Sequence, residues 1–173
     1  MWQGGLSFHG GLLGVIASMF LFSVKKKISF LSIMDAVALS MPIGLGLVRL
    51  GNFLNGELFG KPTNGSWGFI FPTDPYGYPR HPSQIYELIL EGFVLFYVLY
   101  LVSKLKPKPG VVASSLLVFY GLFRFSVEFF REPDAHLGYL TFNLSMGQIL
   151  SLPMIIIGII LVLFFSNKYA KLS

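Results

Sequence analysis

The sequence predicts an all-α integral membrane protein, built as a bundle of about five transmembrane helices in a single domain over residues 1–173. Hydrophobic residues make up 54% of the chain and charged residues only 12%, whereas soluble domains average about 25% charged residues. A bilayer core requires about 20 apolar residues per helix. Five such runs follow one another, at residues 4–24, 28–50, 84–102, 111–130 and 145–165.

The lysines predict how these helices are oriented. Three lysine clusters follow the first run, separate the third run from the fourth, and follow the fifth, at residues 25–27, 104–108 and 168–171. With five spans all three clusters lie on one side, and lysines accumulate on the cytoplasmic side of a membrane. The N-terminus is therefore expected outside and the C-terminus in the cytoplasm. Asp35 lies near the lysine side and is interpreted as an interfacial residue.

The two long connections fall on the opposite, outer side. An extracytoplasmic loop region at residues 55–83 is rich in proline and glycine, which favour turns over helix, and a second connection spans residues 131–144. Ser83, at the end of the first connection, is a predicted N-cap of the third helix. Most of the remaining polar residues also lie on this side, and polar groups at membrane depth indicate function by default. We therefore expect the functional site in the outer half of the protein, and we expect the inner half to anchor the protein in the membrane.

One polar stretch closes the second apolar run. Residues 47–60 place an arginine, two asparagines, a glutamate and three glycines where the chain leaves the bilayer. Arg49 and Asn52 are three positions apart, so they share a face of a helix. The glycines allow the backbone to turn and to approach a ligand closely.

A stripe of polar residues opens the third run. Gln84, Glu87 and Glu91 are spaced so that they lie on one helix face. Two glutamates on a membrane helix must face protein or water rather than lipid. They are interpreted either as functional carboxylates or as ion-pair partners of arginines.

A second polar face closes the fourth run. Arg124, Glu128 and Arg131 lie on one face by spacing, and Arg124 and Glu128 are placed to form a salt bridge. Together with Arg49 these arginines converge on the outer half of the bundle. Because arginine makes bidentate contacts with phosphate, the pattern favours a phospholipid headgroup or another anion as ligand.

His9 lies in a glycine-rich segment at the start of the first run. A histidine titrates near neutral pH, which suits a general base. The alternative is an interfacial histidine beside glycines that serve helix packing.

The sequence lacks the residues and motifs of several familiar kinds of site. The chain has no cysteine, so it has no disulfide, thiolate nucleophile or cysteine metal ligand. It contains no phosphate-binding Walker loop, no paired-histidine zinc motif and no serine nucleophile elbow. Three scattered histidines make a weak case for metal, and no RNA-binding motif is present, so neither a metal nor a nucleic acid is expected.

Five segments, in this order along the chain, resemble the prolipoprotein diacylglyceryl transferase family. They are GGLSFHGG at 4–11, RLGNFLNGELFG at 49–60, HPSQIYE at 81–87, RFSVEFFREPD at 124–134 and SMGQ at 145–148. Together they extend over almost the whole chain. Family members usually have seven spans and a further segment before the first of these motifs, so the resemblance implies an N-terminally truncated member. One smaller departure is Val48, where the family commonly has glycine.

The resemblance implies an enzyme of the bacterial inner membrane whose active site faces the periplasmic half. Such an enzyme transfers the diacylglyceryl group of phosphatidylglycerol to the lipobox cysteine thiol of a preprolipoprotein. The products are a thioether and glycerol phosphate, and no cofactor is implied. The implied partners are phosphatidylglycerol, the lipobox segment and the lipid bilayer.

The resemblance also implies roles for particular residues. Arg49 is expected to hold the phosphate, and Arg124 to act as a second clamp or to stabilise the leaving group. His9 is expected either to deprotonate the thiol or to orient the lipid. Asn52 is expected to donate to the headgroup, and Arg131 to contact the substrate or the lipid interface.

Three further residues are expected to support the site. Glu57 and Glu128 are expected to hold arginines in place, and Gly60 to serve a backbone turn of the loop. Two interpretations from other classes stay open. One is an inactive family remnant or a non-catalytic lipid-binding protein, and the other is a transporter, which the apolar inner halves of the helices disfavour.

Overall fold

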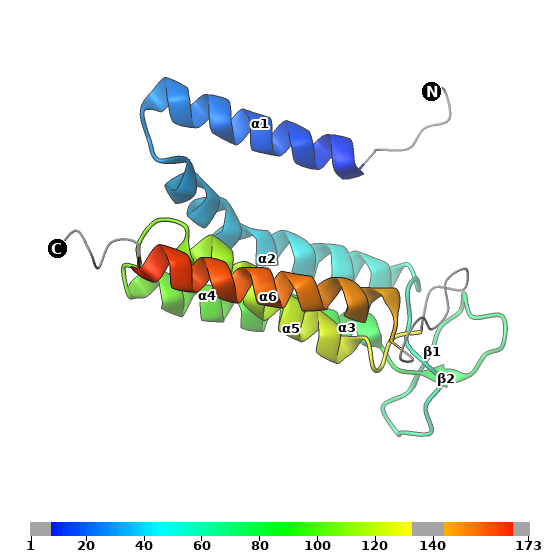
Figure 1. Ribbon diagram of the computed structural model, residues 1–173. Coiled ribbons are helices and arrows are strands. Elements are labelled where there is room, and N and C mark those ends of the chain that lie inside the picture. The colour runs from blue at the N-terminus through cyan, green and yellow to red at the C-terminus, as the bar shows by residue number, and fades with distance from the viewer. Residues whose placement is uncertain (1–7, 133–143, 168–173) are drawn as a thin grey trace, which may run out of the picture.

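The structure is a computed structural model that describes residues 8–132 and 144–167, with side chains described from residue 10 onward (Figure 1). Its helices are α1 (Phe8–Lys26), α2 (Phe30–Leu54), α3 (Ser83–Glu87), the π-helix η1 (Leu88–Val94), α4 (Leu95–Lys104), α5 (Val111–Val127) and α6 (Met146–Asn167). Two short strands, β1 (Phe69–Ile70) and β2 (Pro79–Arg80), lie in the connection between α2 and α3.

Within the described residues, three helical segments are long and apolar enough to cross a membrane. They are Phe30–Leu54, the continuous segment Ser83–Lys104 formed by α3, η1 and α4, and Met146–Asn167. α5 is apolar but shorter, at 17 residues. The predicted all-α membrane fold is confirmed, while the number of five spans stays a prediction.

The helix ends differ from the apolar runs by a few residues. α2 continues four residues past the predicted end, to Leu54, and the amide of Asn55 still donates to the carbonyl of Gly51 at 2.9 Å. α5 stops at Val127, where the amide of Phe130 turns back to the carbonyl of Val127 at 2.9 Å. Hydropathy marks where an apolar surface ends, whereas a helix ends where its backbone hydrogen bonding ends.

The helices α2, α4, α5 and α6 and the π-helix η1 pack as one bundle, and α1 stands apart from it (Figure 1). The buried core of the bundle is Ala38, Leu95, Leu99, Val112 and Leu116. Among the described elements, α1 has backbone contact with α2 alone, and its apolar side chains are mostly exposed. α1 therefore presents an apolar surface of the kind that lipid or another helix covers.

Asp35 has a structural role that the sequence did not indicate. Its carboxylate accepts hydrogen bonds from the amides of Gly110 at 2.7 Å and Ala113 at 2.8 Å. Gly110 is the N-cap residue of α5 and Ala113 lies in its first turn, where the N–H groups have no partner within their own helix. Asp35 is thus an N-terminal cap supplied by another helix. Its interpretation as an interfacial residue beside the lysines stays a prediction.

The loop between α2 and α3 is held against the end of the bundle by pairing within the loop and by a contact with α3. β1 and β2 pair antiparallel, with Phe69 opposite Arg80. Ser83 is not the N-cap of α3, because that position is Pro82. Instead, the Ser83 hydroxyl donates to the carbonyl of Leu58 at 3.1 Å and so attaches the loop to the helix.

Arg80 forms the centre of this loop. Its guanidinium donates to both carboxylate oxygens of Asp74, at 2.7 and 3.2 Å, and it also pairs with Glu132. The Phe59 ring lies 4.7 Å from its guanidinium carbon. These contacts hold the pKa of the Asp74 carboxyl below its usual value of 3.8, chiefly through the hydrogen bond from Arg80.

We expect acid to loosen this loop through Asp74. A carboxyl whose pKa is lowered by folding contributes stability above its unfolded pKa, and the contribution is lost as pH falls through the folded value. In a Trp2→Phe background, Trp67 is the only tryptophan and reports on the loop. Its fluorescence should hold constant from pH 5 down to about 3.8 and change below it, as the carboxyl of Asp74 becomes protonated.

The matched control is Asp74→Asn in the same background. This variant should lose the fluorescence step below pH 3.8, because the amide does not titrate. An unchanged step in Asp74→Asn would mean that another group unfolds the loop.

Candidate active site

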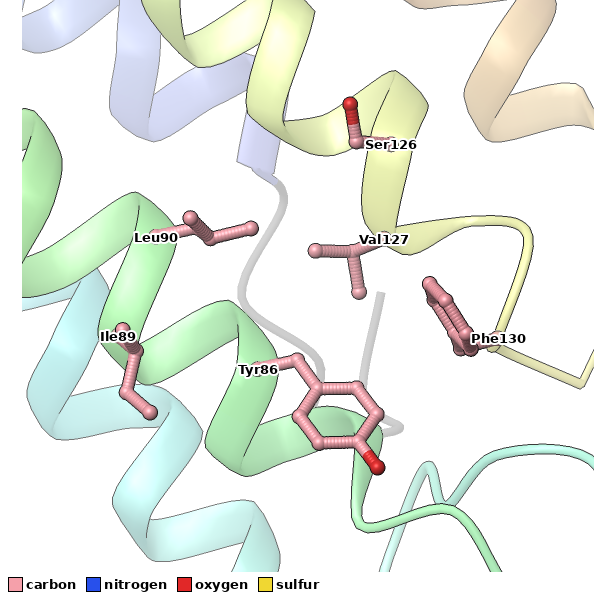
Figure 2. A pocket seen from close by; sticks show the side chains of 6 residues that line it. All are labelled: Tyr86, Ile89, Leu90, Ser126, Val127 and Phe130. Carbon is pink, nitrogen blue, oxygen red and sulfur yellow. The ribbon is translucent and has the colours of Figure 1, made fainter. Parts of the chain in front are cut away.

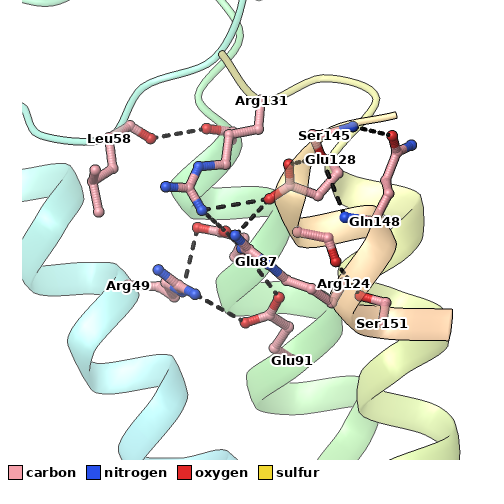
Figure 3. A network of polar contacts seen from close by, with 12 residues as sticks. Arg49, Leu58, Glu87, Glu91, Arg124, Glu128, Arg131, Ser145, Gln148 and Ser151 are labelled. Atoms are coloured by element: carbon pink, nitrogen blue, oxygen red, sulfur yellow. Dashed lines mark hydrogen bonds and ion pairs between the residues drawn. The ribbon is translucent and has the colours of Figure 1, made fainter. Parts of the chain in front are cut away.

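Three arginines and three glutamates meet at the end of the bundle where α2 and α5 end (Figure 3). They come from four parts of the fold: the end of α2, the segment formed by α3 and η1, the end of α5 and the turn that follows it. The members of this charged cluster are Arg49, Glu87, Glu91, Arg124, Glu128 and Arg131. The lysine-rich ends of α1 and α4 lie at the opposite end of the bundle.

Glu87 is the centre of the charged cluster. Its Oε2 lies 3.3 Å from Nε of Arg49, and its Oε1 accepts a hydrogen bond from Nη1 of Arg124. Nη1 of Arg131 lies 3.8 Å from the same Oε1. One carboxylate thus connects arginines from three different parts of the chain.

Glu91 and Glu128 complete the network. Oε2 of Glu91 lies 3.4 Å from Nη2 of Arg49. Oε1 of Glu128 lies 2.5 Å from Nη2 of Arg124 and 3.5 Å from Nη1 of Arg131. The glutamate stripe of the third helix is therefore paired with arginines, as one of the two sequence interpretations expected.

The glutamate side chains of the charged cluster are buried more deeply than its arginine side chains. The carboxylate side chains of Glu87 and Glu91 are 0% exposed and that of Glu128 is 5% exposed, whereas the arginine side chains are 11–14% exposed. The formal charges of the cluster cancel, which keeps the cost of burial down. Arg49 meets its carboxylates through Nε and Nη2, so its Nη1 makes no such contact with the described residues. The buried glutamate carboxylates thus hold the three guanidiniums in place, while part of each arginine side chain stays accessible.

The π-helix begins directly after Glu87. η1 spans Leu88–Val94 and contains Glu91, so the helix widens within the charged cluster. Short π-helical turns inside α-helices are frequent at functional sites. The sequence analysis did not predict this turn, because the segment belongs to a continuous apolar run that is typical of a membrane helix.

The start of α6 supports Glu128. The Ser145 hydroxyl donates to Oε2 of Glu128 at 2.6 Å, and the amide of Gln148 donates to the Ser145 hydroxyl at 3.2 Å. Gln148 Oε1 in turn accepts from the Ser145 amide at 3.0 Å. A Cβ added at Gly147 would lie 2.5 Å from Oε1 of Glu128, so only glycine permits this approach. The serine–glutamine spacing, which is typical of a capping box, is the signal in the sequence from which these contacts could have been predicted.

Two predicted supporting residues differ from their expected roles. The Glu57 side chain is exposed and makes no ion pair with an arginine in the part of the chain that the structure describes. Gly60 is not in a turn, and its φ is not in the left-handed region, unlike that of Gly56. A Cβ at Gly60 would lie 2.5 Å from the carbonyl of Phe130, because Gly60 pairs backbone to backbone with Arg131. Glycine is needed there for close approach rather than for turning.

Two other predicted residues lie at the edge of what the structure describes. Asn52 is half-buried near the end of α2, and its side chain makes no hydrogen bond with the described residues. His9 falls in the first turn of α1, but its side chain lies outside the described residues. The described residues contain no group of three or more side chains suited to hold a metal ion.

Two apolar clefts are lined by residues that neighbour the charged cluster in the sequence. One, of about 390 Å³, lies between the α3–η1 segment and the end of α5, and is lined by Tyr86, Ile89, Leu90, Ser126, Val127 and Phe130 (Figure 2). The other, also about 390 Å³, lies between α2 and η1 and includes Leu47, Leu50 and Leu88. Tyr86 and Leu90 neighbour Glu87 and Glu91 in the sequence, so apolar space adjoins charge.

Comparison with known proteins decides the family. The family model described as prolipoprotein diacylglyceryl transferase matches residues 1–164. The chain belongs to this family. Proteins named phosphatidylglycerol–prolipoprotein diacylglyceryl transferase resemble it closely: that of Geobacter sulfurreducens is 53% identical over 168 residues, and that of Teredinibacter turnerae is 55% identical over 171 residues.

The match extends over nearly all of this chain but not over all of the diacylglyceryl transferases. It covers 97% of this chain and 64% of the Geobacter protein, and 98% of this chain and 59% of the Teredinibacter protein. The transferase from Bordetella parapertussis is 53% identical, with 95% of this chain and 63% of that protein covered. The chain thus spans less than two thirds of the length of these relatives.

Proposed function

We propose that this chain transfers the diacylglyceryl group of phosphatidylglycerol to the lipobox cysteine thiol of a preprolipoprotein, forming a thioether and releasing glycerol phosphate. The names of its relatives support this substrate pair. The observation that carries the proposal is the charged cluster, in which buried carboxylates brace three partly accessible guanidiniums. Guanidinium is the side-chain group best matched to a phosphate.

The reaction defines what the site must do. The thiol loses its proton, the thiolate sulfur attacks the terminal glyceryl carbon, and the carbon–oxygen bond to phosphate breaks. The electron pair of that bond goes to the phosphate oxygen, so negative charge grows on the leaving glycerol phosphate. Fixed positive charge at that phosphate lowers the barrier, because it is aimed where charge develops.

Arg49 and Arg124 are the residues proposed to hold the phosphate. Each is fixed by two or more glutamates, so neither side chain has to be ordered when the lipid binds. Preorganised donors of this kind cost no reorganisation during reaction. Arg131, whose side chain is 11% exposed, is proposed to contact the same lipid or the membrane interface. Asn52, whose side chain makes no hydrogen bond with described residues, is proposed to donate to the headgroup.

The remaining parts of the proposal concern the proton and the membrane. His9 is proposed to take the thiol proton or to orient the lipid. The two apolar clefts suit acyl chains, since they adjoin the charged cluster. The charged cluster lies at the end of the bundle away from Lys26 and Lys104, which supports a site in the periplasmic half and a cytoplasmic C-terminus.

The experiment is to incubate the purified chain with phosphatidylglycerol and a lipobox peptide, and to read the peptide by mass spectrometry. We expect a mass increase of one diacylglyceryl group on the cysteine peptide and none on its Cys→Ser counterpart, with release of glycerol phosphate. Binding of phosphatidylglycerol without any product would favour a non-catalytic lipid-binding protein instead.

A further inference from the structure

Gln84 carries a buried hydrogen-bond acceptor that no described residue uses. Its side chain is 0% exposed, and its Nε2 donates to the backbone carbonyl of Glu57 at 2.6 Å. That bond sets the orientation of the amide, because only the nitrogen can donate to a carbonyl. Oε1 therefore faces away from the Glu57 carbonyl, and it is buried without a partner among the described residues.

An unpaired acceptor of this kind points to a missing donor. Buried polar atoms in native proteins are nearly always hydrogen-bonded, and leaving one unpaired costs stability. The neighbouring Ser83 attaches the same loop with a hydroxyl that donates to Leu58 at 3.1 Å, so its only polar side-chain atom has a partner. Loop attachment alone therefore does not account for a glutamine at position 84.

The position of Gln84 indicates where the donor comes from. Gln84 and Glu87 are three residues apart on one continuous helix, so they share a face. Glu87 pairs with Arg49 and Arg124, the residues proposed to hold the phosphate. Gln84 thus lies about one helical turn from Glu87, on the helix face that carries the proposed phosphate site.

A headgroup hydroxyl is the donor that fits this place. In phosphatidylglycerol the headgroup hydroxyls are a few bonds from the phosphate. An ammonium headgroup would bring a further positive charge to the accessible side of three guanidiniums, whereas a hydroxyl brings none. A neutral amide oxygen is a suitable acceptor for a hydroxyl.

We propose that Oε1 of Gln84 accepts a hydrogen bond from a headgroup hydroxyl of the phospholipid, so that Gln84 selects headgroups that carry hydroxyls. This inference rests on the proposed function, because it takes the arginines to hold the phosphate. It adds to that function a residue that determines which phospholipid is used.

The test compares phosphatidylglycerol with phosphatidylpropanol of the same acyl chains, which keeps the phosphate and lacks the hydroxyls. Binding to the purified chain is measured by native mass spectrometry with both lipids in competition, and transfer to the lipobox peptide is measured for each lipid. The wild-type chain should prefer phosphatidylglycerol by about tenfold, as expected for one hydrogen bond to a buried acceptor. Gln84→Met should abolish the preference.

Ser83→Ala is the matched control, because it removes an equivalent loop attachment without touching an unpaired acceptor. It should keep the preference, even if it changes both rates together. Equal use of the two lipids by the wild-type chain would overturn the inference, whether or not Gln84→Met folds. A preference that survives in Gln84→Met, or that is lost equally in Ser83→Ala, would overturn it as well. Failure of the wild-type chain to bind either lipid or to form product would instead overturn the proposed function.

Discussion

Replacing Arg49 with alanine is expected to lower kcat/KM for diacylglyceryl transfer by a factor on the order of 10² to 10³, the effect of removing one preorganised donor from developing charge. Arg49 contributes a guanidinium that Glu87 and Glu91 hold in place, and its Nη1 makes no ion pair with the described residues. Arg49→Lys should recover only part of the activity, since an ammonium keeps the charge but not the bidentate geometry. Initial rates of thioether formation provide the measurement.

Two controls separate phosphate binding from charge balance. Lys104→Ala removes a positive charge at the opposite end of the bundle and should leave the rate nearly unchanged. Arg49→Ala also leaves carboxylates without their partner, so the charged cluster carries an excess negative charge. Adding Glu91→Gln in the same chain removes one carboxylate and restores the charge balance. If that double variant regained full activity, Arg49 would act by balancing charge and not by holding the lipid phosphate.

Glu87→Gln is expected to destabilise the fold strongly, by about 3–5 kcal/mol, the usual cost of removing one partner from a buried ion pair. Glu87 is 0% exposed and lies within ion-pair distance of Arg49, Arg124 and Arg131, so its loss leaves three guanidiniums around two carboxylates. The measurement is thermal or denaturant unfolding of the purified chain in detergent.

The same substitution at Glu57 is the matched control. Glu57 is exposed and makes no ion pair with described residues, so Glu57→Gln should change stability by less than about 0.5 kcal/mol. Equal stability of the two variants would contradict the view that Glu87 organises the charged cluster.

Much of the fold and of the charged cluster follows from local sequence patterns. Apolar runs of bilayer length predicted the membrane helices, because hydropathy is a local property. The spacing of Gln84, Glu87 and Glu91 predicted one polar face, because side chains three and four positions apart meet on a helix. The same rule placed Arg124 beside Glu128, and the structure pairs them at 2.5 Å.

What the sequence did not predict depends on contacts between distant segments. Asp35 caps α5 across 75 residues, and no local pattern indicates which amide an isolated aspartate reaches. Gly60 is required by the crowded approach of Phe130 and His81, whereas a glycine in a loop is ordinarily interpreted as a turn. Glu57 is close to Arg49 in the sequence, and an ion pair with an arginine was expected. Because α2 ends at Leu54, Glu57 lies beyond the helix, and its side chain is exposed.

The central claim is that the braced arginines hold the phosphate of an anionic lipid, and lipid binding tests it most directly. The purified chain is offered phosphatidylglycerol and a diacylglycerol with the same acyl chains, and bound lipid is counted by native mass spectrometry for the wild type and for Arg49→Ala. The wild type should prefer phosphatidylglycerol by at least about tenfold, as expected for charge-assisted hydrogen bonds to phosphate, and Arg49→Ala should lose most of this preference. Equal binding of the two lipids by the wild type, or an undiminished preference in Arg49→Ala, would contradict the claim.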